Sequence, residues 1–398
     1  MVKIKNIKGR QVFDSRGNPT LEAEVFSDNG SAFSIVPSGA STGTHEAFEL
    51  RDKSSNNYLG KSVFIAVENV NKLIFKALKN IDVGDQAKID KILIELDGTE
   101  QKKKLGANAI LGVSMACCKL AAIEKKIPLY KYLSRTNEYL LPVPLLNIIN
   151  GGVHAKNNLD IQEFMIRPEN TNSFSEAIRR SFLVIQNLKA MLSNTNVGDE
   201  GGFAPDFKSN DEAIEIIIQS IEKSGFKPGK DISICLDVAA NELKEQKTTE
   251  YYLNLIKKYP IKSIEDPFAE DDWESWANIT KNTNIQIVGD DLFATNKKRL
   301  KKGIDEKSAN AILIKLNQIG TVSETLDVID LAQKNGFKTI ISHRSGDSED
   351  TFISDLSVAT KSSQIKAGSL ARSERVSKYN RLIRIEDILG NLAKMAKI

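Results

Sequence analysis

Residues 311–320 read AILIKLNQIG, and the first five of them show the pattern from which the fold can be predicted. Four apolar residues, Ala311 to Ile314, are typical of a buried strand, and they run directly into Lys315. A lysine in this position costs free energy unless a neighbouring group uses its charge. One interpretation is a lysine whose aliphatic stem lets it reach solvent. A partly desolvated lysine is also suited to act as a general base, which makes Lys315 a candidate catalytic residue.

The same pattern, a short apolar run that ends in an ionisable residue, recurs along the second half of the chain. The runs occupy residues 161–163, 232–237, 261–265, 285–290, 339–343 and 364–366. Their final residues are Glu163, Asp237, Glu265, Asp290, His343 and Lys366. From Asp237 to Lys366, with Lys315 included, successive end residues lie 23 to 28 positions apart.

That spacing is the length that a strand, two short loops and a crossover helix require, so it indicates successive βα units of a parallel sheet. Six units, with room for two more strands upstream, predict an α/β fold with a closed (β/α)8-type TIM barrel. In such a barrel the strand-end residues line one rim and form the mouth of a site. A doubly wound open sheet is the alternative, but it would not gather these residues around one axis.

The first part of the chain is organised differently. Alternating apolar and polar residues over 2–13 and 21–26 flank a turn-rich segment and predict an antiparallel hairpin, with a third strand at 32–36. Helical apolar spacing follows at 61–79, 87–96 and 108–126. We therefore predict a small α+β N-terminal domain over residues 1–135 and a barrel domain over residues 136–398. The loop at 37–43, PSGASTG, is either an ordinary connection or a lid over a site.

The composition excludes several classes of protein. A net charge of +3, from 55 basic and 52 acidic residues, indicates no broad surface for nucleic acid or for a membrane. The three cysteines lack metal-ligand spacing and cannot form a disulfide framework, which is typical of reduced thiols in the cytoplasm. The N-terminus has no signal-peptide pattern, and the longest uncharged run, 139–154, contains prolines and glycines and predicts no membrane span.

The end residues of three successive predicted strands are carboxylates, Asp237, Glu265 and Asp290. Three clustered carboxylates repel one another unless a cation neutralises them, and oxygen ligands favour a hard ion such as Mg²⁺. Salt bridges to neighbouring lysines are the alternative.

Further groups follow around the same predicted rim, with Lys315 and Lys366 on one side and Glu163 and Glu200 on the other. A lysine base that faces a glutamic acid across a metal suits the removal of a proton beside a carboxylate. The sequence His343-Arg344-Ser345 adds a guanidinium fork and a hydroxyl, which suit a phosphate, although Arg344 could also form a surface salt bridge.

Many segments of the chain, in order and over nearly its full length, resemble the enolase family. They are DSRGNPT, PSGASTG, LDGTE, GANAILGVS, NIINGGVHA, IQEFMI, VGDEGG, SIEDP, VGDDL, LIKLNQIG, ISHRSG and RSERVSKYNRLIRIE. The resemblance implies the enolase variant of the barrel and the reversible dehydration of 2-phospho-D-glycerate to phosphoenolpyruvate. It also implies two Mg²⁺ ions per active site and a homodimer in which Glu22 pairs with Arg384 of a second copy.

The resemblance implies a role for each matched residue. Lys315 corresponds to the base that takes the C2 proton, and Glu200, assisted by Glu163, to the acid that protonates the departing hydroxyl. The implied ligands of the first Mg²⁺ are Asp237, Glu265 and Asp290, and Ser41 in the 37–43 loop is an implied ligand of the second. The implied substrate contacts are His154, Gln162, Glu163, His343, Arg344, Ser345 and Lys366. This favours the lid interpretation of residues 37–43.

The chain also departs from the family pattern. The interval from Asp237 to Glu265 is shorter than in typical relatives, and Ala367 stands where threonine is common. Two rival functions remain open: a muconate-cycloisomerase-like or racemase-like enzyme, and a structural or surface-adhesion protein on the same scaffold.

Overall fold

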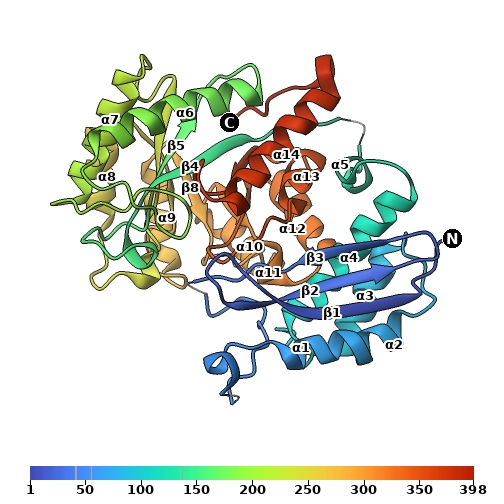
Figure 1. The fold of residues 1–398 in the computed structure, drawn as a ribbon. Helices are drawn as coiled ribbons and strands as arrows, with labels where there is room; N and C mark the ends of the chain where they lie inside the picture. Colours follow the sequence, from blue (N-terminus) through green and yellow to red (C-terminus); the bar gives the residue numbers. More distant parts are fainter. Residues whose placement is uncertain (41–42, 55, 137) are drawn as a thin grey trace.

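The structure is a computed structural model that describes residues 1–40, 43–54, 56–136 and 138–398. Within this part of the chain, a three-stranded N-terminal sheet lies beside a closed eight-stranded barrel (Figure 1). The fold predicted from the repeating strand ends is therefore confirmed, and an open doubly wound sheet is excluded.

The N-terminal sheet is antiparallel in the order β1-β2-β3, with β1 at Asn6–Phe13, β2 at Pro19–Phe26 and β3 at Ser31–Ile35. Every second residue of β2 from Leu21 to Val25 is buried, as the alternating pattern predicted. The hairpin and the third strand are thus confirmed, and β3 begins one residue earlier than expected.

After a 3₁₀ turn at Asn57–Gly60, six further helical segments follow this sheet among the described residues. They are α1 (Phe64–Asn69), a π-helical turn (Val70–Ile74), α2 (Phe75–Leu78), α3 (Gln86–Asp97), α4 (Ala107–Glu124) and α5 (Leu129–Leu133). The helix predicted at 61–79 is thus a succession of three segments, because the π-turn interrupts it.

Helix α4 packs against β2 and is buried on nearly all sides. A Cβ atom at Gly112 would lie 2.8 Å from Leu21 Cδ2, so this close approach of helix and sheet requires glycine. The helix is long and apolar enough to cross a membrane, with a mean hydropathy of 1.4, but 83% of it is buried inside the protein. Such burial is typical of a core helix rather than a membrane span.

The barrel closes in the order β10-β11-β4-β5-β6-β7-β8-β9. Its strands are β4 (Val143–Asn150), β5 (Glu163–Pro168), β6 (Ile232–Asp237), β7 (Ile261–Glu265), β8 (Gln286–Gly289), β9 (Ala311–Ile314), β10 (Lys338–Ser342) and β11 (Gln364–Lys366). Apolar side chains fill the interior in one cluster that includes Leu145, Met165, Cys235, Val288, Leu313 and Ile340. The strands from β6 to β11, and β11 with β4, pair in parallel, which confirms the predicted βα units.

One prediction about the barrel was wrong. Residues 161–163 were expected to end a strand at Glu163, but Glu163 begins β5, which is antiparallel to both β4 and β6. The connection from β4 to β5 holds only the 3₁₀ turn Gly152–His154, which is too short to be a crossover helix. Because β5 runs in the opposite direction, its first residue pairs with the last residue of β6, Asp237. Glu163 therefore lies at the predicted rim, but as the first residue of its strand rather than the last.

The helices of the barrel lie outside the strands (Figure 1). They are α6 (Phe174–Met191), α7 (Asn210–Lys223), α8 (Thr249–Lys258), α9 (Trp273–Asn282), α10 (Lys297–Glu306), α11 (Leu316–Ile319), α12 (Val322–Lys334), α13 (Phe352–Ala359) and α14 (Ser373–Leu389). Short 3₁₀ turns lie at Asn57–Gly60, Ala240–Glu242 and Gly390–Leu392. The residues that precede α6, α7 and α12, namely Ser173, Ser209 and Thr321, each accept a hydrogen bond from the backbone N–H three residues later.

Two helices, α6 and α7, separate β5 from β6, and the antiparallel direction of β5 explains why. A strand that descends to the base of the barrel must be followed by an even number of helices if the next strand is to ascend from the same end. The loop between α6 and α7 consequently returns to the rim, and it carries Glu200 there.

Candidate active site

A polar pocket opens at the rim where the parallel strands end. It is lined mainly by residues that the sequence predicted, namely His154, Gln162, Glu163, Glu200, Asp237, Asp290, Lys315, His343, Arg344, Ser345 and Lys366. Glu265 does not line the pocket, but its carboxylate accepts a hydrogen bond from Lys366, which does. Ser41 lies outside the described residues. The predicted strand ends are thus brought together around one site.

Lys366, at the end of β11, gathers three of the predicted acids. Its Nζ lies 2.8 Å from Asp237 Oδ2, 2.9 Å from Glu265 Oε1 and 3.2 Å from Glu163 Oε2. Burial lowers the pKa of Lys366, but these carboxylates outweigh burial and hold the pKa well above its usual value. Burial raises the pKa values of Glu163 and Glu265, because a desolvated carboxylate among other acids resists ionisation.

Lys315 follows β9 and contacts Asp290 through its ammonium group. Its side chain is only 13% exposed, so the interpretation as a lysine that reaches solvent is wrong. Burial lowers the pKa of Lys315, but the adjacent Asp290 carboxylate outweighs it and raises the pKa above the usual value. Burial likewise opposes ionisation of Asp290, and Lys315 outweighs it, so the pKa of Asp290 is lowered.

The predicted trio of metal ligands is divided between these two lysines. The carboxylates of Asp237 and Glu265 form ion pairs with Lys366, whereas the carboxylate of Asp290 forms an ion pair with Lys315. Asp290 forms a tighter group with Asp266 and Asp291, within which one ligand oxygen from each residue lies within 4.8 Å of the others. Sequence reasoning did not assign Asp266 or Asp291, although each directly follows a predicted ligand in the segments EDP and GDD.

Asp266 supports the rim through an unusual backbone conformation. Its φ is 42°, in the left-handed region that costs free energy for a residue other than glycine. Its carboxylate accepts the backbone N–H groups of Asp290 and Asp291, each at 2.8 Å. Asp266 therefore orients the start of the loop after β8.

The chemistry of this donor set fits a hard divalent cation. Asp237, Glu265 and Asp290 are buried carboxylates, and the raised pKa of Glu265 reflects burial together with an excess of negative charge around it. Oxygen ligands of this kind are those that Mg²⁺ prefers. These three residues, with Asp266 and Asp291 beside them, are the ones that could hold such an ion.

Glu200 lies between two histidines. Its Oε2 lies 3.3 Å from His343 Nε2 and accepts a hydrogen bond of 3.2 Å from Asn147, while its Oε1 lies 3.9 Å from His154 Nε2. Burial lowers the pKa of His343 to about 4 and also lowers the pKa of His154, so both rings are neutral near pH 7. The loop requires glycine at position 201, because the φ of Gly201 is 82° and a Cβ there would lie 2.6 Å from the Ala371 carbonyl oxygen.

Arg344 is a buried guanidinium rather than part of a surface salt bridge. Its Nη1 and Nη2 lie 2.8 Å and 3.2 Å from the two carboxylate oxygens of Glu46, and Nη1 also donates to Asn317 Oδ1 at 3.0 Å. Arg375 donates to the carbonyl oxygens of Arg344 and Ser345, each at 2.6 Å. Glu46 and Arg375 were not predicted, since nothing in their local sequence marks them as partners of residues about 300 and 30 positions away.

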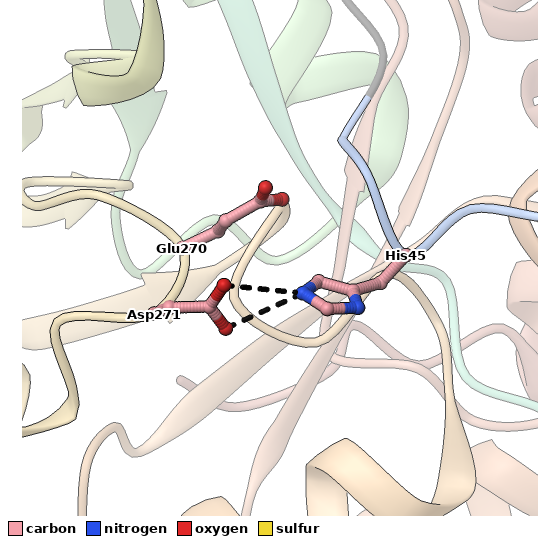
Figure 2. Close-up of side chains that lie close together, drawn as sticks. All are labelled: His45, Glu270 and Asp271. Carbon is pink, nitrogen blue, oxygen red and sulfur yellow. Dashed lines mark hydrogen bonds and ion pairs between the residues drawn. The ribbon is translucent and has the colours of Figure 1, made fainter.

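A further cluster of His45, Glu270 and Asp271 lies outside this pocket (Figure 2). His45 Nε2 is 3.3 Å from Asp271 Oδ1, and Thr44 donates to Glu270 through its hydroxyl at 2.6 Å. These contacts join the segment after residue 43 to the loop after β7. The three residues of the cluster are partly or fully exposed, so it serves as a surface connection.

The mixed barrel, its rim of acids and lysines, and the separate N-terminal sheet define a class of enzymes that remove a proton beside a carboxylate with the help of a metal. Comparison with known proteins narrows the class. The model described as "Enolase, N-terminal domain" matches residues 4–133, and that described as "Enolase, C-terminal TIM barrel domain" matches residues 138–254 and 241–398. An enolase of Pelagibacter ubique (strain HTCC1062) is 60% identical over 417 aligned residues, which cover 100% of both chains. The chain belongs to the enolase family.

The two matches to the barrel domain overlap at residues 241–254. This overlap falls between Asp237 and Glu265 and includes part of the 3₁₀ turn Ala240–Glu242 and the start of α8.

Proposed function

We propose that this chain catalyses the reversible dehydration of 2-phospho-D-glycerate to phosphoenolpyruvate, the glycolytic reaction of the enolase family. The observation that carries the proposal is the single pocket in which Lys315, Glu200, the buried acids and Arg344 all meet. Membership of the family over the full length of the chain supports it.

In this proposal two groups that line the pocket transfer two different protons. Lys315 accepts the C2 proton, for which it must first lose the proton that Asp290 stabilises on it, and Glu200 donates a proton to the departing C3 hydroxyl, with Glu163 beside it. Burial raises the pKa of Glu200, but His343 and His154 outweigh burial and hold the pKa well below its usual value, so Glu200 must first take up a proton before it can act as the acid. Asn147 holds the carboxylate in position.

The substrate is bound through its two anionic ends. Arg344 and Ser345 bind the phosphate, and Lys366 lies beside the carboxylate, with His154, Gln162 and His343 as further contacts. Asp237, Glu265 and Asp290 would hold one Mg²⁺, and Ser41 is the proposed ligand of a second. When bound, the two ions supply positive charge that stabilises the enediolate form of the substrate.

The test is a turnover assay with 2-phospho-D-glycerate, in which formation of phosphoenolpyruvate is followed by ultraviolet absorbance. We expect activity with Mg²⁺ and its loss when the ion is removed by a chelator. A metal-loaded protein that binds but does not dehydrate this substrate would overturn the proposal and favour an adhesion role. Turnover of a substrate without phosphate would favour the cycloisomerase-like or racemase-like alternative, for which the buried Arg344 has no evident use.

We also propose a cytoplasmic homodimer with domains at 1–135 and 136–398. The three cysteines are free and buried, which suits a reducing compartment. Glu22 lies 2.7 Å from Arg10 of its own chain, and Arg384 on α14 is exposed and has no ion pair among the described residues. Arg384 is therefore available to meet the paired Glu22 of a second copy.

A further inference from the structure

A chain of buried hydrogen bonds connects Lys315 to Asp290 through the protein. The backbone N–H of Lys315 donates to the hydroxyl of Thr295 at 2.9 Å, and that hydroxyl donates to Gln318 Oε1 at 2.8 Å. Gln318 Nε2 then donates to Asp290 Oδ1 at 2.8 Å. Thr295 is 0% and Gln318 1% exposed, so water does not compete for these groups.

The direction of this chain is determined by its last bond. A carboxylate oxygen can only accept, so the amide nitrogen of Gln318 must face Asp290 as a donor, and Oε1 of the same amide faces Thr295. The Thr295 hydroxyl accepts from the backbone N–H of Lys315 and donates its own proton to that oxygen. The Gln318 orientation is thus set by the hydrogen bonds around it, and one oxygen of Asp290 is satisfied by an uncharged group.

Thr295 adopts a costly conformation to make these contacts. Its φ is 49° and follows a φ of 45° at Ala294, which places a β-branched residue in the left-handed region. Such strain is retained only where the surroundings require it. Here it places the hydroxyl between Lys315 and Gln318.

We propose that Gln318 is a positioning residue, which binds Oδ1 of Asp290 and thereby presents the other oxygen, Oδ2, to the cation and to Lys315. The proposal rests on the function proposed above, because it concerns the orientation of a candidate Mg²⁺ ligand. The second N–H of the same amide lies 3.4 Å from Glu46 Oε1, and Glu46 holds Arg344. Gln318 thus connects the metal side of the pocket to the phosphate side.

The experiment measures the affinity of the protein for Mg²⁺ alone by calorimetry, without substrate. Removal of a partner that orients a ligand commonly weakens metal binding 10- to 100-fold, and we expect a loss of about this size for Gln318→Leu. Thr295→Val, which keeps the shape but loses the hydroxyl, should shift the affinity in the same direction. Thr295→Ser should bind Mg²⁺ nearly as the wild type does. Activity of Gln318→Leu should recover as the Mg²⁺ concentration is raised.

Gln286→Leu is the matched control, because Gln286 is another buried glutamine of the barrel, at the start of β8, where it bonds Ser263 and Gln364. It should lower the unfolding temperature without changing the Mg²⁺ affinity. Wild-type Mg²⁺ affinity in Gln318→Leu would overturn the inference. If that variant fails to fold, wild-type affinity in Thr295→Val would overturn it. The proposed function fails separately, if the wild type binds Mg²⁺ but does not turn over 2-phospho-D-glycerate.

Discussion

Lys315 shows how much of a residue's role depends on its neighbours. By itself it is a lysine at the end of an apolar run, and its burial alone would lower its pKa. In the structure its ammonium group contacts the Asp290 carboxylate, which raises the pKa of Lys315 above its usual value. The residue's position was predicted correctly from the sequence, whereas the partner that controls its charge became visible only in the fold.

Lys315→Ala removes the proposed base. We expect exchange of the C2 proton of the substrate with solvent to fall by at least about 10²-fold, because general base catalysis typically contributes 10²–10⁴-fold. The exchange rate can be measured in deuterated water by NMR. Lys338→Ala, at the exposed start of β10, is the control and should exchange at the wild-type rate. A wild-type exchange rate in Lys315→Ala would contradict the assignment.

His343 makes stability depend on pH in a specific window. Burial lowers its pKa to about 4 in the folded state, against 6.5 for an unperturbed histidine. As the pH falls below 6.5 the unfolded chain binds a proton that the folded chain does not, so stability is lost between pH 6.5 and 4, by at most about 3 kcal/mol.

The measurement compares urea unfolding of the wild type and His343→Gln from pH 8 to pH 4.5. We expect the variant to lose less stability than the wild type as the pH falls below 6.5. Between pH 7 and 8, where the histidine is neutral in both states, the two proteins should show the same slope. Parallel curves over the whole range would show that His343 is not the group responsible.

Glu46 neutralises a buried charge. Glu46→Ala would remove the carboxylate that contacts the Arg344 guanidinium, which is only 3% exposed. Breaking a buried pair in this way costs about 3–5 kcal/mol, which chemical denaturation would detect. Glu24→Ala, which removes a partly exposed partner of Arg10, should cost about 1 kcal/mol or less. Equal losses in the two variants would contradict the importance of burial at Arg344.

At the scale of elements, the first turn of α12 is capped by residues from another part of the molecule. The N–H of Val322 donates to Ser114 Oγ of α4 at 3.0 Å, and that of Ser323 donates to Asp90 of α3 at 2.9 Å. Thr321 provides the local cap, because its side chain accepts a hydrogen bond from the backbone N–H of Glu324. The helices beside the N-terminal sheet are thus attached to the barrel directly behind β9 and Lys315.

Asp90→Ala removes this connection between elements. Because it leaves the partly buried N–H of Ser323 without this acceptor, we expect a loss of about 2 kcal/mol in the free energy of unfolding. Ser209→Ala, at the local cap of α7, should cost about 1 kcal/mol and provides the comparison. If Asp90→Ala costs no more than Ser209→Ala, the contact between α3 and α12 adds nothing beyond an ordinary cap.

At the scale of the whole molecule, the proposed homodimer can be tested through its mass in solution. We expect sedimentation at micromolar concentration to give the mass of a dimer. Arg384→Glu should raise the dissociation constant about tenfold or more, because it places like charges opposite each other at the contact with Glu22. Lys397→Glu reverses a charge near the C-terminus that is not proposed to meet Glu22, and it should leave the mass unchanged. A monomeric wild type would contradict the proposal.

The sequence by itself determined the barrel, the parallel strands that end in ionisable residues, and the type of chemistry at their rim. Strand length, apolar runs and helix caps are local properties, so they can be predicted from neighbouring residues. The direction of β5, the pairing of Arg344 with Glu46, and the bonds that join Lys315 to Asp290 through Thr295 and Gln318 were decided only by the tertiary structure. These features depend on contacts between residues that are far apart in the sequence. Because the contacts are buried, they affect the free energy of the fold more than exposed contacts would.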